Sequence, residues 1–165
     1  MRGILLCFIF LSLPAQSQNF VGFDGYCGLP VIETSLKQGA IAYMDLQGNP
    51  SILIDPGILR DWNTEFTNFT LAHECAHHQL EHSTVEGRLE RLVYPTVTVE
   101  QEFDADCEAG KLISANFGND YLRQALRKLG RDFPGTNGYP SGHERVKNVV
   151  RCLVDAGLFV PKRRR

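Results

Sequence analysis

The amino-acid sequence predicts an α+β fold that is mostly helical and carries a small antiparallel sheet or hairpin. Two short β-prone runs, residues 40–45 and 51–55, are joined by residues 46–50, whose Gly, Asn and Pro are typical of a hairpin turn. After this hairpin, apolar residues recur at helical spacing in several segments. A chain of 165 residues is long enough for one domain with a core of its own.

Four helical segments are expected after the hairpin. They are one that begins near Asn63 or Thr64, one that Glu102 opens and that ends at 116–118, one over 121–129, and one over 142–156. Asn63 or Thr64 would cap the first segment, and the helix dipole favours Glu65 in its first turn. The pattern Ser141-x-x-Glu144 is a capping box that opens the last segment.

The N-terminus has the three parts of a secretory signal peptide. Arg2 precedes an apolar run over 4–13, and residues 15–17 place small side chains two apart before a cleavage site. Ten apolar residues are too few to span a bilayer. We therefore predict a signal peptide at 1–17 and a single domain at 18–165, in a periplasmic or secreted protein without stable membrane insertion.

The sequence His73-Glu74-Cys75-Ala76-His77 has the spacing of a zinc site on a helix. Positions four apart lie on the same helical face, so the two imidazoles can bind one Zn²⁺. Glu74 follows the first histidine directly and would act on a water bound to the metal. This pattern indicates a hydrolase.

Glu102 and Asp106 are candidates for the third zinc ligand and for the residue that orients a ligand histidine. A catalytic zinc takes three protein ligands and leaves one position for water, and two histidines with one glutamate are a known set. Glu102 would be the third ligand, and Asp106, one turn further on the same face, would accept the free N–H of a zinc-bound imidazole. The other acidic residues of this stretch are expected to point elsewhere: Glu100, Asp104 and Glu108.

The motif H-E-x-x-H at 73–77, followed by E-x-x-A-D at 102–106, resembles the gluzincin metallopeptidases, in particular the group of the heat-shock membrane proteases and the CAAX prenyl proteases. The resemblance covers roughly residues 66–153 and does not include the transmembrane helices of the membrane members. It implies a zincin-like metallopeptidase fold with Glu74 as the general base. It also implies three zinc ligands: His73, His77 and Glu102.

The segment 139–146 is similar to a part of this family in which His-Pro is followed by an arginine and a helix. Tyr139 stands where the family usually has histidine, so stabilisation of the transition state would fall to Tyr139 or His143. We take His143 as the candidate catalytic residue. Arg145 could pair with Asp106 near the zinc, or with its own neighbour and solvent, which is the usual arrangement of an arginine.

Two other families share part of the motif. Peptide deformylases also carry His-Glu-Cys, but there it continues into Asp-His-Leu and is paired with a separate cysteine motif, whereas here Ala76 follows. Phage immunity-repressor proteases fit the spacing nearly as well. They are cytosolic regulators, and this chain begins like an exported protein.

The cysteines left after removal of residues 1–17 are Cys27, Cys75, Cys107 and Cys152. An even number in an oxidising compartment predicts two disulfides, with three possible pairings. We favour Cys75–Cys107, which would join the two zinc-bearing helices, and Cys27–Cys152. Free buried thiols are the alternative.

His78 and His82 form a second pair four residues apart, about 100° around the first helix. No glutamate follows the first member directly, so we expect a solvated face rather than a metal site.

The function expected from these residues is a zinc-dependent endopeptidase that hydrolyses peptide bonds with a metal-activated water. The alternative is an exported, zinc-stabilised binding module that acts by recognising a partner. A formal net charge of −2 at pH 7 favours neither nucleic acid nor membrane as a partner, and the basic run 161–165 is expected to be a solvated end. The expected partner is a peptide or protein substrate, and no pattern indicates an oligomeric state.

Overall fold

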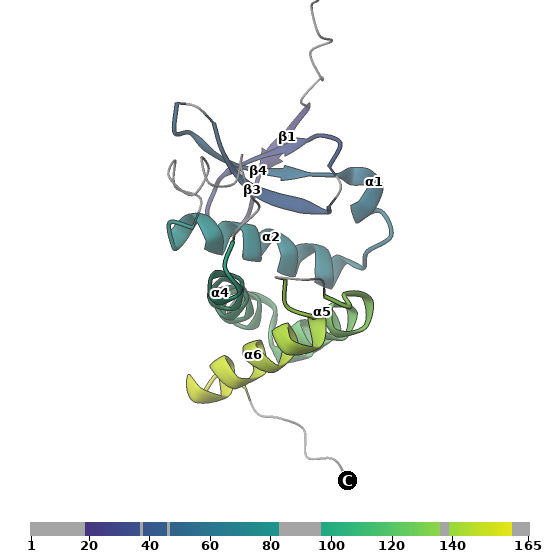
Figure 1. Cartoon of the computed structure of the whole chain (residues 1–165), viewed down its shortest axis with the longest axis vertical. Coiled ribbons are helices and arrows are strands. Elements are labelled where there is room, and N and C mark those ends of the chain that lie inside the picture. Colours follow the sequence, from purple (N-terminus) through teal and green to yellow (C-terminus); the bar gives the residue numbers. More distant parts are fainter. Residues whose placement is uncertain (1–18, 37, 46, 83–96, 136–138, 160–165) are drawn as a thin grey trace, which may run out of the picture.

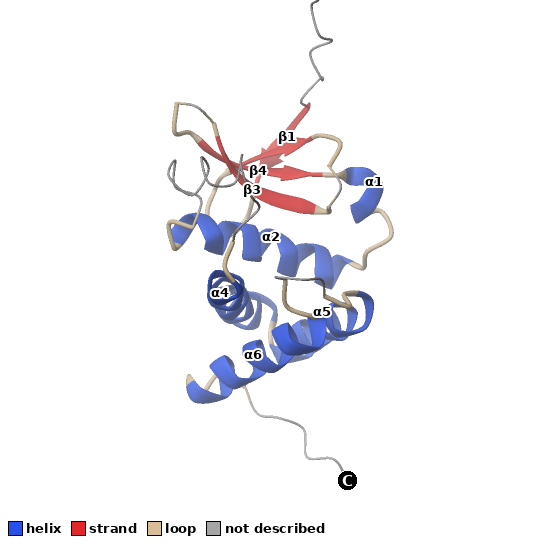
Figure 2. Cartoon of the chain, viewed as in Figure 1, coloured by secondary structure: helices blue, strands red, loops and turns tan. Residues whose placement is uncertain are grey.

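The α+β class is confirmed by the structure, a computed structural model that describes residues 19–36, 38–45, 47–82, 97–135 and 139–159. A four-stranded sheet forms one layer and the long helices form another, with helix α2 lying between the sheet and the other long helices (Figure 1, Figure 2). The predicted signal peptide, residues 1–17, lies outside the described residues. No helix within those ranges is long and apolar enough to cross a membrane.

The strands are β1 (Asn19–Phe23), β2 (Pro30–Glu33), β3 (Ala40–Met44) and β4 (Pro50–Ile54). They lie in the order β1-β2-β4-β3. The antiparallel hairpin of β3 and β4 is confirmed. The expectation of an antiparallel sheet is otherwise wrong, because β2 pairs parallel to β4, with Val31 opposite Ile52. The chain runs through β3 before it forms β4, and β4 then lies beside β2 in the same direction. The sheet is therefore mixed.

β1 and β2 were not predicted from the sequence because each is short and contains a residue that weakens a strand pattern. The pairing of β1 with β2 shifts register between Phe20 and Gly22, so the alternation of side chains is broken there. β2 begins with Pro30, a residue that strands accept at their first position because it has no N–H to donate.

Helix α2 (Thr64–Gln79) begins as expected at Asn63, whose side-chain oxygen accepts the N–H of Phe66 at 3.2 Å. The helix is covered on both sides. On one side Cys75 packs with Ala40 and Ile52 of the sheet. On the other side Phe66 and Phe69 belong to the larger core that the helices share. This position in the centre of the fold buries the residues of the His-Glu motif.

The other helices within the described ranges are α1 (Pro56–Leu59), α4 (Val99–Phe117), α5 (Asn119–Asp132) and α6 (Gly142–Asp155). Thr98 caps α4 in a capping box with Gln101, so this helix begins three residues before Glu102. The predicted capping box of Ser141 and Glu144 opens α6. The first residue of α6 must be small, because a Cβ on Gly142 would collide with the carbonyl oxygen of Leu129 in α5.

The disulfides are Cys27–Cys75 and Cys107–Cys152, with Cα atoms 5.9 Å apart in each pair. The two expected disulfides are confirmed in number, but both expected pairings, Cys75–Cys107 and Cys27–Cys152, are wrong. Cys75 is two residues from each motif histidine, which places it about 200° around the helix, toward the sheet. Cys107 lies on the side of α4 that faces α6. Neither cysteine can reach the other, because the facing sides of α2 and α4 carry the motif residues instead.

Candidate metal centre

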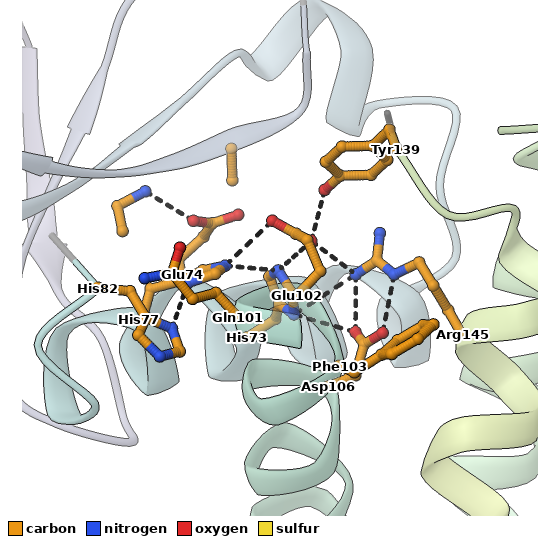
Figure 3. A network of polar contacts seen from close by, with 12 residues as sticks. His73, Glu74, His77, His82, Gln101, Glu102, Phe103, Asp106, Tyr139 and Arg145 are labelled. Carbon is orange, nitrogen blue, oxygen red and sulfur yellow. Dashed lines mark hydrogen bonds and ion pairs between the residues drawn. The ribbon is translucent and has the colours of Figure 1, made fainter. Parts of the chain in front are cut away.

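His73, His77 and Glu102 meet in the interior between α2 and α4, and we call these three residues the His-Glu cluster (Figure 3). The Nε2 atoms of the two histidines are 3.0 Å apart. His73 Nε2 lies 3.2 Å from Oε2 of Glu102, and His77 Nε2 lies 3.4 Å from Oε1. Each residue is at most 4% exposed. The cluster brings together the three residues that the sequence predicts as metal ligands.

The separations within the His-Glu cluster fit a metal ion. Nitrogen and oxygen ligands of a tetrahedral zinc lie about 2.0–2.1 Å from the ion, which places any two of them roughly 3.3 Å apart. The three observed separations of 3.0–3.4 Å agree with that value. The same contacts are also ion pairs if a histidine is protonated. The geometry therefore supports a group that could bind a metal, but it does not identify which metal.

The charge of this interior also favours a divalent cation. Glu74, Glu102 and Asp106 are buried carboxylates, and Arg145 is the buried cation among them. With neutral histidines, the group carries two more negative charges than positive ones. Buried charges of one sign are costly unless they are paired or coordinate a metal. A divalent ion would balance this excess.

Asp106 contacts the other nitrogen of His73. Its Oδ1 lies 3.0 Å from His73 Nδ1, and Arg145 donates to both of its oxygens, from Nε at 2.8 Å and from Nη2 at 2.7 Å. The guanidinium also lies 3.7 Å from Glu102. The structure thus brings Arg145 of α6 to Asp106 rather than to solvent, and Asp106 orients the ring of His73 toward the cluster.

The carboxylates beside His73 favour its protonated form when no metal is bound. Burial alone would lower the pKa of His73, but its hydrogen bonds with Asp106 and Glu102 outweigh burial and raise the pKa to about 10. Burial would raise the pKa of Glu102, but the contacts with His73 and His77 hold that pKa far below its usual range. A metal ion bound here must therefore displace a proton from His73.

Glu74 is held by the sheet. Its Oε2 accepts the backbone N–H of Ala42 in β3 at 2.6 Å, and its side chain is buried. The carboxylate lies next to the His-Glu cluster on the β3 side (Figure 3). The edge strand β3 therefore fixes the direction in which Glu74 points.

Of the two candidates near the C-terminus, Tyr139 is the one that reaches the cluster. Its hydroxyl donates to Oε2 of Glu102 at 2.5 Å, and the Arg145 guanidinium lies 5.7 Å from the centre of its ring. Tyr139 is 42% exposed as a whole, but desolvation of its hydroxyl beside Glu102 and the charges of Glu102 and Glu74 raise its pKa far above the usual range despite Arg145. The hydroxyl is thus a hydrogen-bond donor at neutral pH. His143 is exposed in the first turn of α6 and is not brought to the cluster.

The expectation of a solvated face for His78 and His82 is wrong. His78 Nε2 lies 2.9 Å from the carbonyl oxygen of Ser51 in β4. His82 follows the end of α2, and its Nδ1 lies 3.1 Å from Nδ1 of His77. The sequence gives little signal for this contact, because Glu81 occupies the left-handed position where a helix-ending turn normally has glycine.

A second group of possible metal donors, Asp24, Cys27 and Cys75, has a different explanation. The two cysteines form a disulfide, so they offer no thiolate. Asp24 accepts the backbone N–H groups of Tyr26, Cys27 and Leu29 and thereby shapes the turn between β1 and β2. This group is part of the scaffold.

No protein-family model matches the chain, and comparisons with curated proteins and with solved structures found no match either. The likeness to the gluzincins therefore rests on the motifs at 73–77 and 102–106. Those motifs are the ones that the fold brings together in the His-Glu cluster.

Proposed function

We propose that this chain is a gluzincin-type, zinc-dependent endopeptidase. The observation that carries the proposal is the convergence of two imidazoles and one carboxylate, at ligand-to-ligand separations of 3.0–3.4 Å, beside a second buried carboxylate on Glu74. Two histidines and a glutamate are a known ligand set of catalytic zinc. The zincin-like assignment of the fold belongs to the same proposal.

Each residue near the cluster has a role in this proposal. His73, His77 and Glu102 would hold the zinc, which would supply a Lewis acid that polarises a carbonyl and lowers the pKa of water to roughly 7. Glu74 takes the proton of the attacking water and passes it to the leaving amine. Tyr139 donates its hydroxyl hydrogen to the carbonyl oxygen of the scissile bond as negative charge develops there.

The two disulfides support an exported protein. Disulfides persist in oxidising compartments such as the periplasm or the extracellular space. The proposed substrate is accordingly a peptide or protein in the periplasm or outside the cell.

One observation favours the alternative of a zinc-stabilised binding module. The contacts of His73 with Glu102 and Asp106, and of Asp106 with Arg145, join α2, α4 and α6 into one buried network. A metal in this network would stabilise the fold whether or not peptides are cleaved. Partner recognition would then be the function.

The variant Glu74→Gln tests the endopeptidase. It should keep one zinc per chain, measured by elemental analysis, and should lose the cleavage of unfolded casein, followed by mass spectrometry of the fragments. The matched control His73→Ala should lose both the zinc and the cleavage. If the wild-type protein binds zinc and cleaves no site in casein or in a random peptide library, the endopeptidase is wrong and the binding module is supported. If Glu74→Gln stays fully active, Glu74 is not the base.

A further inference from the structure

His82 contacts the ring of His77 on the side that faces away from Glu102. The Nδ1 atoms of the two histidines are 3.1 Å apart, and the rings are inclined by 61° with centroids 5.2 Å apart. Nε2 of His77 points the other way, toward His73 and Glu102. Both nitrogens of His77 are therefore engaged, one within the His-Glu cluster and one with His82 (Figure 3).

The backbone at the end of α2 places His82 at this point. The N–H of His82 donates to the carbonyl oxygen of His77 at 2.8 Å, and the N–H of Glu81 donates to that of His78 at 3.1 Å. These are the two hydrogen bonds of a Schellman motif, which reverses the chain after a helix. The reversal turns the His82 ring back onto the ring of His77.

The residue that permits this turn is in an unfavourable conformation. Glu81 has a φ of 59°, and it is the only residue other than glycine with a positive φ in the described part of the chain. Glycine is the usual residue at this position of the motif. Such a conformation persists only where the surrounding structure holds it, and such residues gather at functional sites. The strained turn at Glu81 therefore supports the view that the fold holds His82 in this position.

The two motif histidines differ in what contacts their outer nitrogens. His73 Nδ1 faces the carboxylate of Asp106, to which Arg145 also donates two hydrogen bonds. His77 Nδ1 faces the imidazole of His82. A metal-binding histidine must carry its hydrogen on the nitrogen that does not bind the ion, and a hydrogen-bond acceptor at that nitrogen fixes the tautomer and the ring orientation.

We propose that His82 is a positioning residue for His77. Nδ1 of His82 accepts the hydrogen on Nδ1 of His77, which leaves the lone pair on Nε2 of His77 directed into the His-Glu cluster. The inference rests on the metal centre of the proposed function and extends it to a residue outside both motifs.

Four variants test this role. His82→Leu keeps much of the bulk and removes the acceptor, and His82→Ala removes both. His82→Asn places an acceptor oxygen where Nδ1 of histidine lies. Glu81→Gly is the matched control, because glycine retains the turn without strain. The measurements are the zinc dissociation constant, from competition with a chromogenic chelator, and the visible absorption bands of the Co²⁺-substituted protein.

Loss of the acceptor should weaken zinc binding about 10–100-fold, the usual effect of removing a residue that orients a ligand histidine. We expect this loss in His82→Leu and His82→Ala, together with altered Co²⁺ bands, while His82→Asn and Glu81→Gly keep the affinity and bands of the wild type. Wild-type zinc affinity in His82→Leu and His82→Ala would overturn the inference, and so would equal losses in His82→Asn and His82→Leu. Failure of the wild-type protein itself to bind zinc would instead overturn the proposed metal centre, and this role of His82 with it.

Discussion

Asp106 and Arg145 form a buried two-point ion pair that ties α4 to α6. Both carboxylate oxygens accept from the guanidinium, at 2.7 and 2.8 Å, and Asp106 is fully buried. Because Asp106 also lies 3.0 Å from His73 Nδ1, the pair connects the C-terminal helix to a proposed metal ligand. The position of α6 therefore bears directly on the geometry of the His-Glu cluster.

Replacement of Arg145 by Met should destabilise the protein strongly. The change removes both guanidinium hydrogen bonds from the buried carboxylate of Asp106, and loss of one partner of a buried ion pair costs roughly 3–5 kcal/mol of the free energy of unfolding. Urea unfolding of the metal-free protein measures the loss. Arg151→Met is the matched control, because Arg151 is exposed on the same helix and should change stability by no more than about 0.5 kcal/mol. Equal stabilities of the two variants would contradict a buried pair.

Three single substitutions on α4 should weaken zinc binding in a fixed order. Glu102→Ala removes a proposed ligand and should cost the most. Asp106→Ala removes the acceptor for His73 and should cost about 10–100-fold. Glu100→Ala should change little, because Glu100 is exposed in the first turn of α4. Zinc titration against a competing chelator ranks them, and a larger loss in Glu100→Ala than in Glu102→Ala would mean that the ligand is misassigned.

The sequence predicts the residues of this site because helical spacing places each pair on one face of its helix. The interval of four residues puts His73 and His77 on one face, and Glu102 and Asp106 on another, wherever the two helices lie. The same rule could have corrected the disulfides, since Cys75 must point about 200° away from His73. The pairing with Cys27 could not be predicted, because it depends on β1 and β2, which carry weak strand patterns.

Two contacts of the site that helical spacing does not predict are made by residues outside the helices. Tyr139 precedes α6, and its approach to Glu102 is a tertiary contact that local patterns do not specify. His82 reaches His77 only because Glu81 adopts a left-handed conformation that the sequence gives no reason to expect. Residues outside the regular helices, such as Tyr139 and His82, therefore could not be predicted from helical spacing.

The metal-free protein should lose stability as the pH rises through the alkaline range. Folding raises the pKa of His73 from 6.5 to about 10, so its protonated form stabilises the fold fully below about pH 6.5, and this contribution disappears as the pH passes about 10. The expected loss is on the order of a few kcal/mol. Urea unfolding in the presence of a chelator, at several pH values, measures it. The zinc-loaded protein is the control, because neutral His73 in that form should remove this dependence. A flat profile for the metal-free protein would contradict the raised pKa.

Tyr139→Phe should separate catalysis from metal binding. The hydroxyl of Tyr139 lies beside Glu102 and stays protonated, so it can donate a hydrogen bond where negative charge develops on a substrate carbonyl. Removing one such donor typically lowers kcat by about 10²–10³. The variant should retain one zinc per chain, because the phenyl ring keeps its place beside Arg145. His143→Ala is the matched comparison and should leave both zinc content and kcat unchanged, since His143 is exposed and outside the cluster. Casein cleavage and elemental analysis decide between the two residues, and a large loss of kcat in His143→Ala with none in Tyr139→Phe would reverse the assignment.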